Sequence, residues 1–173
     1  MSEGTDCGRA GISETLGAPY REGLHESRVE PLVPATLKVL VADDNRDFAE
    51  SLGMLLSMSG YSVLLAHSGA QALSLALRER PDALILDIGM PELSGYDVAR
   101  GVREQAWGKE SLLLAISGWD QRRDREASTA AGFDVHLSKP ARPERVEQLL
   151  ADFSARSEQR RAGATAVPNL TPP

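Results

Sequence analysis

The sequence predicts an α/β fold in which helices cover both faces of a doubly wound parallel sheet. Between residues 36 and 154, short apolar runs suited to strands alternate five times with segments suited to helices. Alternation of this kind is typical of a parallel sheet. The run at 83–86 is apolar throughout, which indicates a strand buried on both faces.

The first strand is expected at 37–42, and the polar residues 43–45 end it. Asp44 or Asn45 can cap the next helix, because either side chain can accept a hydrogen bond from a free N–H group at the helix N-terminus. Gly60 is placed to end that helix. Its predicted apolar stripe at helical spacing consists of Phe48, Leu52, Leu55 and Leu56.

A second strand is expected at 62–66, followed by a helix at 68–80 in which Leu73 and Leu77 lie one turn apart. Pro81 then breaks the chain before the central strand. The remaining elements are expected at 95–105 (helix), 111–116 (strand), 120–131 (a charged helix), 133–137 (strand) and 142–154 (helix). Right-handed crossovers restrict the topology, and the flavodoxin-like strand order 2-1-3-4-5 fits this pattern.

The two ends of the chain differ from this region. Residues 1–35 are rich in Gly, Ser, Glu and Arg with scattered prolines, and residues 155–173 are polar and end in prolines. Neither shows a sustained period, so both are predicted to be disordered. The one domain with a core is therefore expected at 36–154.

Charge and composition exclude several classes of function. The formal net charge is −6, which argues against a general binder of nucleic acid or anionic membranes. The single cysteine, Cys7, rules out a disulfide framework and favours a reducing compartment. No apolar signal segment or stretch of transmembrane length is present, so a cytoplasmic location is expected.

Four predicted strands end at, or directly before, residues whose side chains can take part in a reaction. The first is followed by Asp43 and Asp44, the third by Asp87, the fourth by Ser117 and the fifth by Lys139. Parallel strands end at the same sheet edge, and in the order 2-1-3-4-5 these four are neighbours about 4.8 Å apart. Three carboxylates so close repel one another unless they share a cation, and hard oxygen ligands open to water suit Mg²⁺.

This set of groups suits phosphoryl transfer. A divalent cation and Lys139 can neutralise phosphoryl oxygens while Asp87, the central residue, acts as the nucleophile and forms an acyl phosphate. Ser117 can then bond a phosphoryl oxygen. Taken singly, each residue also fits a structural role: Asp43 and Asp44 as caps, Ser117 in a turn and Lys139 on the surface. Their joint arrival at one edge favours the site.

At these positions the chain resembles the receiver domains of two-component response regulators, from Leu37 to about Phe153. The resemblance rests on matching residues and similar spacings along the chain. The matching residues are Asp43, Asp44, Asp87, Met90, Pro91, Gly95, Ser117, Gly118, Lys139 and Pro140.

The resemblance implies that Asp87 is phosphorylated by a histidine kinase or a histidine phosphotransfer protein. It also implies that Asp44 and Asp87 bind Mg²⁺ directly, Asp43 through water, and Gly89 through its backbone carbonyl. Lys139 would contact the phosphoryl group, and the bond from Lys139 to Pro140 would be cis.

In this family a hydroxyl residue and an aromatic residue move together as a switch. Ser117 matches the first of these positions. His136 stands where the family usually has Tyr or Phe, so the switch is expected to differ in detail, because a histidine can also gain a proton near neutral pH. A histidine merely packed at a strand end is the alternative.

The predicted function is therefore a phosphoacceptor switch that catalyses only its own phosphorylation and dephosphorylation. We expect it to act as a monomer or weak homodimer through partner binding or onward phosphotransfer, without a DNA-binding output domain. The pattern around Asp87 and His136 resembles receivers attached to hybrid histidine kinases.

The main alternative is a phosphohydrolase that uses an aspartyl phosphate, but such enzymes carry a second aspartate where this chain has Gly89. An FMN-binding flavodoxin would need a phosphate-binding loop after the first strand, where this chain has Asp43 and Asp44, whose charges would repel a phosphate. A purely structural adaptor is a further alternative, but it would have no need of all the charged residues at the strand ends.

Overall fold

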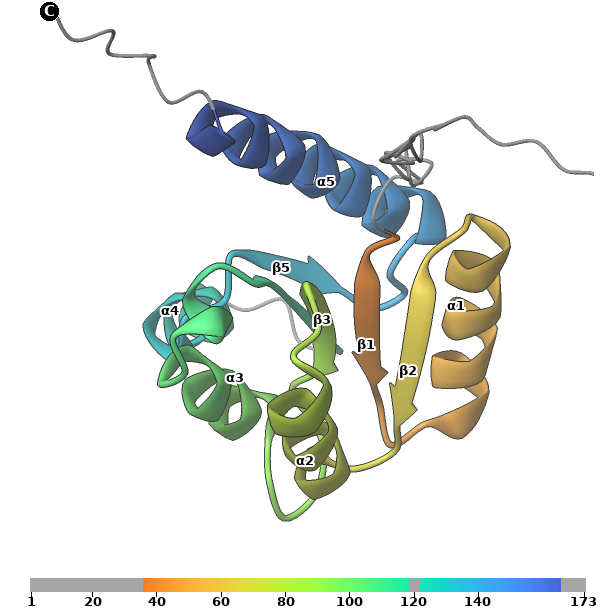
Figure 1. The fold of residues 1–173 in the computed structure, drawn as a ribbon. Helices are drawn as coiled ribbons and strands as arrows, with labels where there is room; N and C mark the ends of the chain where they lie inside the picture. Colours follow the sequence, from red (N-terminus) through yellow and green to blue (C-terminus); the bar gives the residue numbers. More distant parts are fainter. Residues whose placement is uncertain (1–35, 119–121, 166–173) are drawn as a thin grey trace, which may run out of the picture. The chain divides into compact units, whose positions relative to one another are not determined.

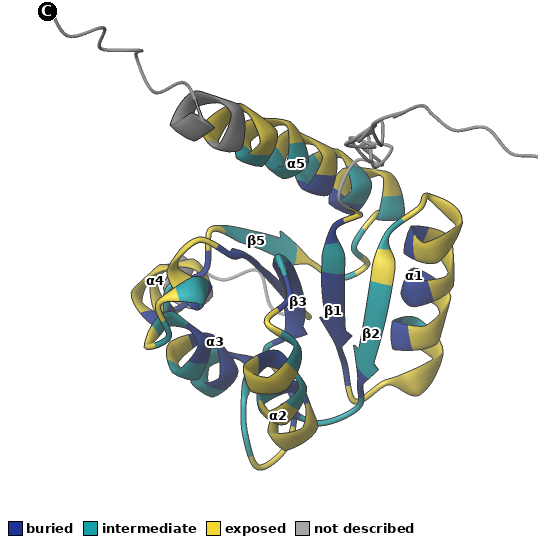
Figure 2. Cartoon of the chain, viewed as in Figure 1, coloured by how far each residue is buried: buried dark blue, intermediate teal, exposed yellow. Residues whose placement is uncertain are grey.

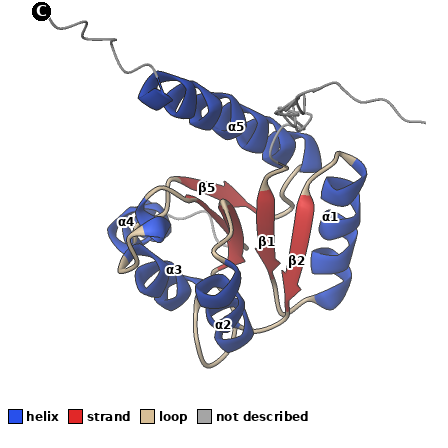
Figure 3. Cartoon of the chain, viewed as in Figure 1, coloured by secondary structure: helices blue, strands red, loops and turns tan. Residues whose placement is uncertain are grey.

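The computed structural model describes residues 36–118 and 122–165, in which five strands alternate with five α-helices (Figures 1 and 3). The strands are β1 (Lys38–Ala42), β2 (Ser62–Ala66), β3 (Ala83–Asp87), β4 (Leu112–Ser117) and β5 (Val135–Ser138). The helices are α1 (Arg46–Met58), α2 (Gly69–Glu79), α3 (Gly95–Arg103), α4 (Arg122–Ala131) and α5 (Pro143–Thr165), with a short 3₁₀ helix, η1 (Trp107–Lys109), after α3. The predicted disorder of residues 1–35 and 166–173 concerns segments outside the described residues.

The five strands form one sheet in the order β2-β1-β3-β4-β5, and all neighbouring strands are parallel. The predicted flavodoxin-like topology is confirmed. The register pairs Ala42 with Leu86, Asp87 with Ile116 and Ser117 with Ser138. The carboxyl ends of β1, β3, β4 and β5 therefore lie together at one edge of the sheet.

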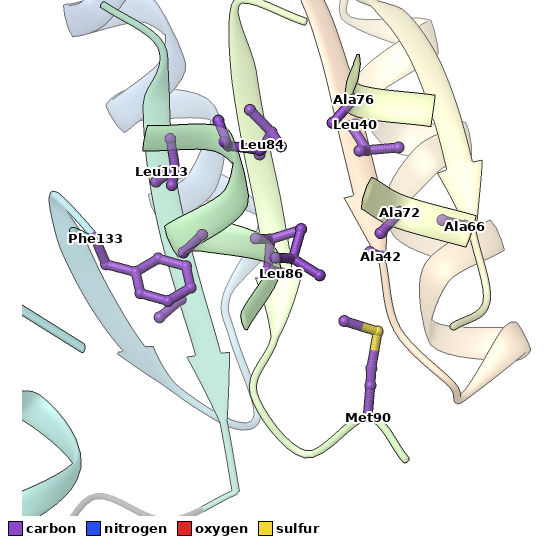
Figure 4. Packing of buried hydrophobic residues seen from close by; sticks show 14 of the residues in the cluster. Leu40, Ala42, Ala66, Ala72, Ala76, Leu84, Leu86, Met90, Leu113 and Phe133 are labelled. Carbon is purple, nitrogen blue, oxygen red and sulfur yellow. The ribbon is translucent and has the colours of Figure 1, made fainter. Parts of the chain in front are cut away.

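Helices cover both faces of the sheet, and its three central strands, β1, β3 and β4, are largely buried, whereas the edge strands β2 and β5 are mostly half-buried (Figure 2). Alternate residues of a strand point to opposite faces. On one face, Leu84 and Leu86 of β3 pack in a cluster with residues of α2, α3 and α4, part of which Figure 4 shows. On the other face, Ala83 and Ile85 of the same strand pack with residues of α1 and α5. The central strand is thus buried on both sides, as predicted.

Two leucines that the sequence placed on apolar stripes are instead exposed. Leu55 on α1 is 41% exposed and Leu77 on α2 is 44% exposed. Small residues take the positions nearest the sheet, among them Gly53 on α1 and Ala76 on α2. A Cβ atom at Gly53 would lie 2.8 Å from the Leu65 side chain, so a small residue is what lets α1 approach β2 this closely. The rest of the stripe predicted for α1, namely Phe48, Leu52 and Leu56, packs in the core as expected.

The last helix is longer than predicted. The sequence placed its end near Ser154 and expected disorder from Ala155, whereas α5 continues to Thr165. The added segment is rich in Ala, Arg, Glu and Gln, which favour helix, and the next proline is Pro168. Once nucleated, a helix propagates through such residues without needing a buried face. The described residues include no helix long and apolar enough to cross a membrane.

Gly69, the first residue of α2, packs against the loop that joins β3 to α3. A Cβ atom at this position would lie 1.8 Å from the carbonyl oxygen of Leu93. Backbone cannot yield as a flexible side chain can, so any larger residue would displace the loop or the helix. By contrast, a Cβ atom at Gly101 on α3 would approach only the Leu73 side chain, at 3.0 Å.

We predict that Gly69→Ala lowers the free energy of unfolding by about 2 kcal/mol or more, the usual cost of overpacking a core. Gly101→Ala is the matched control, because the side chain it meets can shift and the gain in helix propensity, about 1 kcal/mol, offsets the crowding. Urea denaturation of both variants and the wild type measures these differences. Equal effects of the two substitutions would contradict the close contact with Leu93.

Candidate functional site

The carboxyl edge of the sheet brings together the five polar residues that the sequence singled out there. Asp43 and Asp44 follow β1, Asp87 ends β3, Ser117 ends β4 and Lys139 follows β5. The backbone N–H of Lys139 donates to the carbonyl oxygen of Ser117 at 2.7 Å, which extends the pairing of β4 and β5 beyond the last strand residue. The residues sit at one site because they occupy equivalent places on neighbouring strands.

The three aspartates form a compact acidic cluster. Asp43 is 1% exposed and Asp87 is 6% exposed, whereas Asp44 faces solvent. One carboxylate oxygen from each lies within 4.8 Å of the others, so all three could hold a metal ion. The backbone N–H of Asn45 donates to Oδ1 of Asp43 at 2.9 Å and fixes the orientation of that carboxylate. Two carboxylates kept almost out of water require a compensating positive charge.

Within the described part of the chain, Lys139 supplies a positive charge to the two buried carboxylates, Asp43 and Asp87. Its Nζ lies 2.8 Å from Oδ2 of Asp43 and 3.1 Å from Oδ1 of Asp87. The same Nζ lies 5.3 Å from the centre of the Phe48 ring, at the start of α1, within the range of a cation–π contact. The peptide bond between Lys139 and Pro140 is cis. The predicted alternative, a surface lysine pointing into solvent, is not what the structure shows.

Burial and the neighbouring charges shift the pKa values of two of these groups. Burial raises the pKa of Asp87 above its ordinary value and the Asp43 carboxylate raises it further, although Lys139 opposes both effects. For Lys139, burial lowers the pKa, but the bonds to Asp43 and Asp87 outweigh it and the pKa lies above its ordinary value. Lys139 therefore remains charged at neutral pH and holds the two carboxylates together.

The loop after β3 is shaped by glycines around Asp87. The backbone of Gly89 lies beside the Asp87 carboxylate and lowers its pKa, against the larger raising effects of burial and Asp43. A Cβ atom at Gly95 would lie 2.4 Å from the carbonyl oxygen of Asp87, so only glycine allows the start of α3 to approach the strand end this closely. Ser94 then caps α3 by accepting from the N–H of Asp97, and the Asp97 side chain accepts from the N–H of Ser94 in return. The predicted role of the Gly89 carbonyl as a metal ligand stays a prediction.

A pocket of about 240 Å³ opens beside the acidic cluster. Its lining residues are Asp87, Ile88, Gly89, Tyr96, Ser117, Gly118 and Lys139. Tyr96 of α3 was not among the residues that the sequence predicted for the site, and the structure adds it to the pocket wall. Its place in the first turn after the Gly89–Gly95 loop is the signal that could have suggested this.

His136 on β5 contacts the site through Ser117. Nε2 of His136 lies 3.0 Å from Oγ of Ser117, and Nδ1 lies 2.8 Å from Oγ of Ser128 on α4. The side chain is therefore held at both ring nitrogens. Sequence reasoning did not identify Ser128, because no pattern along the chain shows that this face of a charged helix meets the fifth strand. Trp119, which lies two residues after Ser117 in the sequence, is outside the described residues.

The chemical groups at this site limit which reactions it can support. A buried carboxylate, Asp87, faces a pocket large enough for a small anion, with an ammonium group and a hydroxyl at its walls. The three carboxylates offer hard oxygen ligands with one side open to water, which suits a hydrated divalent cation. This arrangement fits transfer of a small anionic group to a carboxylate.

Comparison with known proteins is consistent with this geometry. The profile of the family described as "Response regulator receiver domain" matches residues 39–151. Response regulator MprA of Mycobacterium avium is 42% identical over 119 residues, which cover 69% of this chain and 50% of that protein. The chain thus spans about half the length of the curated relatives it matches.

Solved structures give the same result. A putative response regulator from Chloroflexus aurantiacus is 30% identical with a TM-score of 0.64, over 69% of this chain and 98% of that one. The receiver domain of sensor histidine kinase PA1611 from Pseudomonas aeruginosa, solved with a magnesium ion in its active site cleft, is 30% identical with a TM-score of 0.64, over 70% and 99% of the two chains. The chain belongs to the family of response regulator receiver domains of two-component systems.

Proposed function

We propose that the chain is a phosphoacceptor switch in which Asp87 receives a phosphoryl group from a phosphohistidine of a histidine kinase or a phosphotransfer protein. The observation that carries this proposal is the position of Asp87, buried at a strand end, facing the pocket and bonded to Lys139. The family membership supports it. Among the described residues, Asp87 is the one aspartate that lines this pocket.

In the transfer step, a carboxylate oxygen of Asp87 forms a bond to phosphorus while the N–P bond of the donor phosphohistidine breaks. The electron pair of that bond stays on the imidazole nitrogen, which takes a proton from water. Lys139 lies close enough to the carboxylate to shift its ammonium group toward a phosphoryl oxygen, and Ser117 lines the same pocket and can donate a hydrogen bond to another. In dephosphorylation, water attacks phosphorus and the bond from phosphorus to the Asp87 oxygen breaks, which returns the free carboxylate and releases inorganic phosphate.

We assign the metal of this site as Mg²⁺, held by Asp43, Asp44 and Asp87, with the Gly89 carbonyl as a further predicted ligand. The three carboxylates fit such an ion, since each offers an oxygen within 4.8 Å of the others and Asp44 leaves one side open to water. When bound, Mg²⁺ neutralises negative charge on the transferring phosphoryl group. The magnesium ion in the similar PA1611 receiver supports this assignment.

The phosphohydrolase alternative is less well supported. That chemistry needs a general acid beside the nucleophile, and the position two residues after Asp87 holds Gly89, which has no side chain that could donate a proton. We therefore propose that the chain catalyses only its own phosphorylation and dephosphorylation. We propose further that its output passes through partner binding or onward phosphotransfer, for which the likeness to a receiver of a sensor histidine kinase is the support.

We predict that acetyl phosphate with Mg²⁺ adds one phosphoryl group to the wild-type chain and none to Asp87→Asn, because the amide is not a nucleophile at neutral pH. Intact-protein mass spectrometry measures the addition. Asp152→Asn on the exposed face of α5 is the matched control and should be modified like the wild type. A phosphoryl group on Asp87→Asn at the wild-type rate would refute the assignment of the acceptor.

We predict that Lys139→Met binds Mg²⁺ about tenfold more tightly than the wild type and yet accepts a phosphoryl group far more slowly. The substitution removes a positive charge that competes with the cation for Asp43 and Asp87, and it also removes the group that neutralises the incoming phosphoryl oxygen. Calorimetric titration with MgCl₂ and the rate of reaction with acetyl phosphate measure the two effects. Lys109→Met, at an exposed position on η1, should change neither.

A further inference from the structure

The ammonium group of Lys139 contacts two carboxylates and one aromatic ring. Its Nζ lies 2.8 Å from Oδ2 of Asp43 and 3.1 Å from Oδ1 of Asp87. The same atom lies over the ring of Phe48, 5.3 Å from its centre. The face of an aromatic ring attracts a cation at this distance. Lys139 is therefore held by partners of two kinds, of which only the carboxylates carry a charge.

The first turn of α1 fixes the Phe48 ring beside the acidic cluster. The Asn45 side chain caps α1 by accepting from the backbone N–H of Phe48 at 3.2 Å. The backbone N–H of Asn45 in turn donates to Oδ1 of Asp43 at 2.9 Å. The Phe48 side chain is half-buried and packs against the apolar cluster between the sheet and α1 and α5. The loop that orients the Asp43 carboxylate thus also sets the position of the ring, and both contact Lys139.

The attractions that hold Lys139 respond differently to the chemistry of the site. A carboxylate oxygen that binds a cation or forms a bond to phosphorus has less negative charge to offer an ammonium group. Asp43 and Asp87 are both ligands in the proposed metal site, and Asp87 is also the proposed acceptor, so both ion pairs weaken during the reaction. A phenyl ring is no ligand for Mg²⁺, which takes oxygen ligands. The attraction between Phe48 and Lys139 therefore persists.

We propose that Phe48 is a positioning residue for Lys139, whose ring keeps the ammonium group at the wall of the pocket while Asp43 and Asp87 are engaged by a cation or a phosphoryl group. Lys139 then stays within reach of a phosphoryl oxygen. This inference rests on the proposed function and deepens it. It gives a second role to a residue that the sequence placed on the apolar stripe of α1.

The contact can be measured without any phosphorylation. The chain contains three lysines, Lys38, Lys109 and Lys139, so ¹H–¹³C spectra of the lysine-labelled chain are simple, and the signals missing in Lys139→Met assign Lys139. We expect the ring of Phe48 to shift the ε-methylene protons of Lys139 upfield, both without added metal and in saturating MgCl₂. In Phe48→Leu these signals should move toward those of the exposed Lys109.

Two results of this measurement would overturn the proposal. One is the same position of the Lys139 signals in the wild type and in Phe48→Leu, which would mean that the ring does not face the lysine. The other is loss of the upfield shift when MgCl₂ is added, which would mean that the ring does not hold Lys139 once the carboxylates bind a cation.

The role in the reaction is tested by weakening the attraction of the ring without changing its size appreciably. Replacement of Phe48 by mono-, di- and trifluorophenylalanine withdraws electron density from the ring face step by step. With acetyl phosphate and Mg²⁺, we expect the rate of phosphorylation of Asp87 to fall stepwise, by about fivefold in the trifluoro variant, the factor that corresponds to a typical cation–π contact. A rate that does not depend on the number of fluorine atoms contradicts the proposal.

Two further variants separate the electrostatic role of the ring from packing. Phe48→Tyr keeps an aromatic face and should retain most of the rate, whereas Phe48→Leu should not. Trifluorophenylalanine in place of Phe153 is the matched control, because this residue of α5 packs against the same apolar cluster and is not part of the pocket beside Asp87. It should leave the rate unchanged, and an equal loss at both positions would assign the effect at Phe48 to packing.

A double-mutant cycle tests whether Phe48 acts through Lys139. Trifluorophenylalanine in place of Phe48 should cause no further loss of rate in the Lys139→Met background. Independent, multiplying effects of the two substitutions would overturn the proposal. If the wild type accepts no phosphoryl group, the proposed function fails, whereas the lysine spectra still decide whether the ring holds Lys139.

Discussion

The ion pairs of Lys139 with Asp43 and Asp87 are the interaction on which the rest of the site depends. Two carboxylates that are almost fully buried at adjacent strand ends would repel each other and resist ionisation without a nearby cation. Lys139 contacts both and keeps them charged in a small volume. A divalent cation or a phosphoryl group that enters the pocket would change the charges around Lys139, and with them the strength of its ion pairs with Asp43 and Asp87.

The fold supports this pair by bringing strand ends together and by keeping side chains small where backbone meets backbone. Asp87 is held at the carboxyl edge of the sheet because the strand that it ends is buried between two layers of helices. Gly95 lets α3 begin directly against the Asp87 carbonyl, and Gly69 lets α2 begin against the Leu93 carbonyl. The β3–α3 loop is therefore held at both ends by contacts that a single methyl group would disrupt.

Hydrogen bonds between Ser117 and His136 and between His136 and Ser128 connect the pocket to α4. A tyrosine at position 136 could offer one hydroxyl, whereas an imidazole links two partners and fixes the proton state of one by that of the other. The site around Lys139 and this line of hydrogen bonds meet at Ser117, which lines the pocket and contacts His136. The pocket beside Asp87 is thereby in contact with α4 through Ser117, His136 and Ser128.

The sequence by itself determined the α/β class, the strand order and the residues at the sheet edge. It could do so because a fully apolar strand, a strand-helix alternation and polar residues at strand ends are local patterns, and right-handed crossovers leave few topologies. It misjudged Leu55, Leu77 and the end of α5, since which side of a stripe packs, and how far a solvated helix runs, depend on neighbours distant in the chain. Only the tertiary structure placed Tyr96 in the pocket wall and Ser128 against His136, because such contacts arise where separate elements meet and leave no periodic signal along the chain.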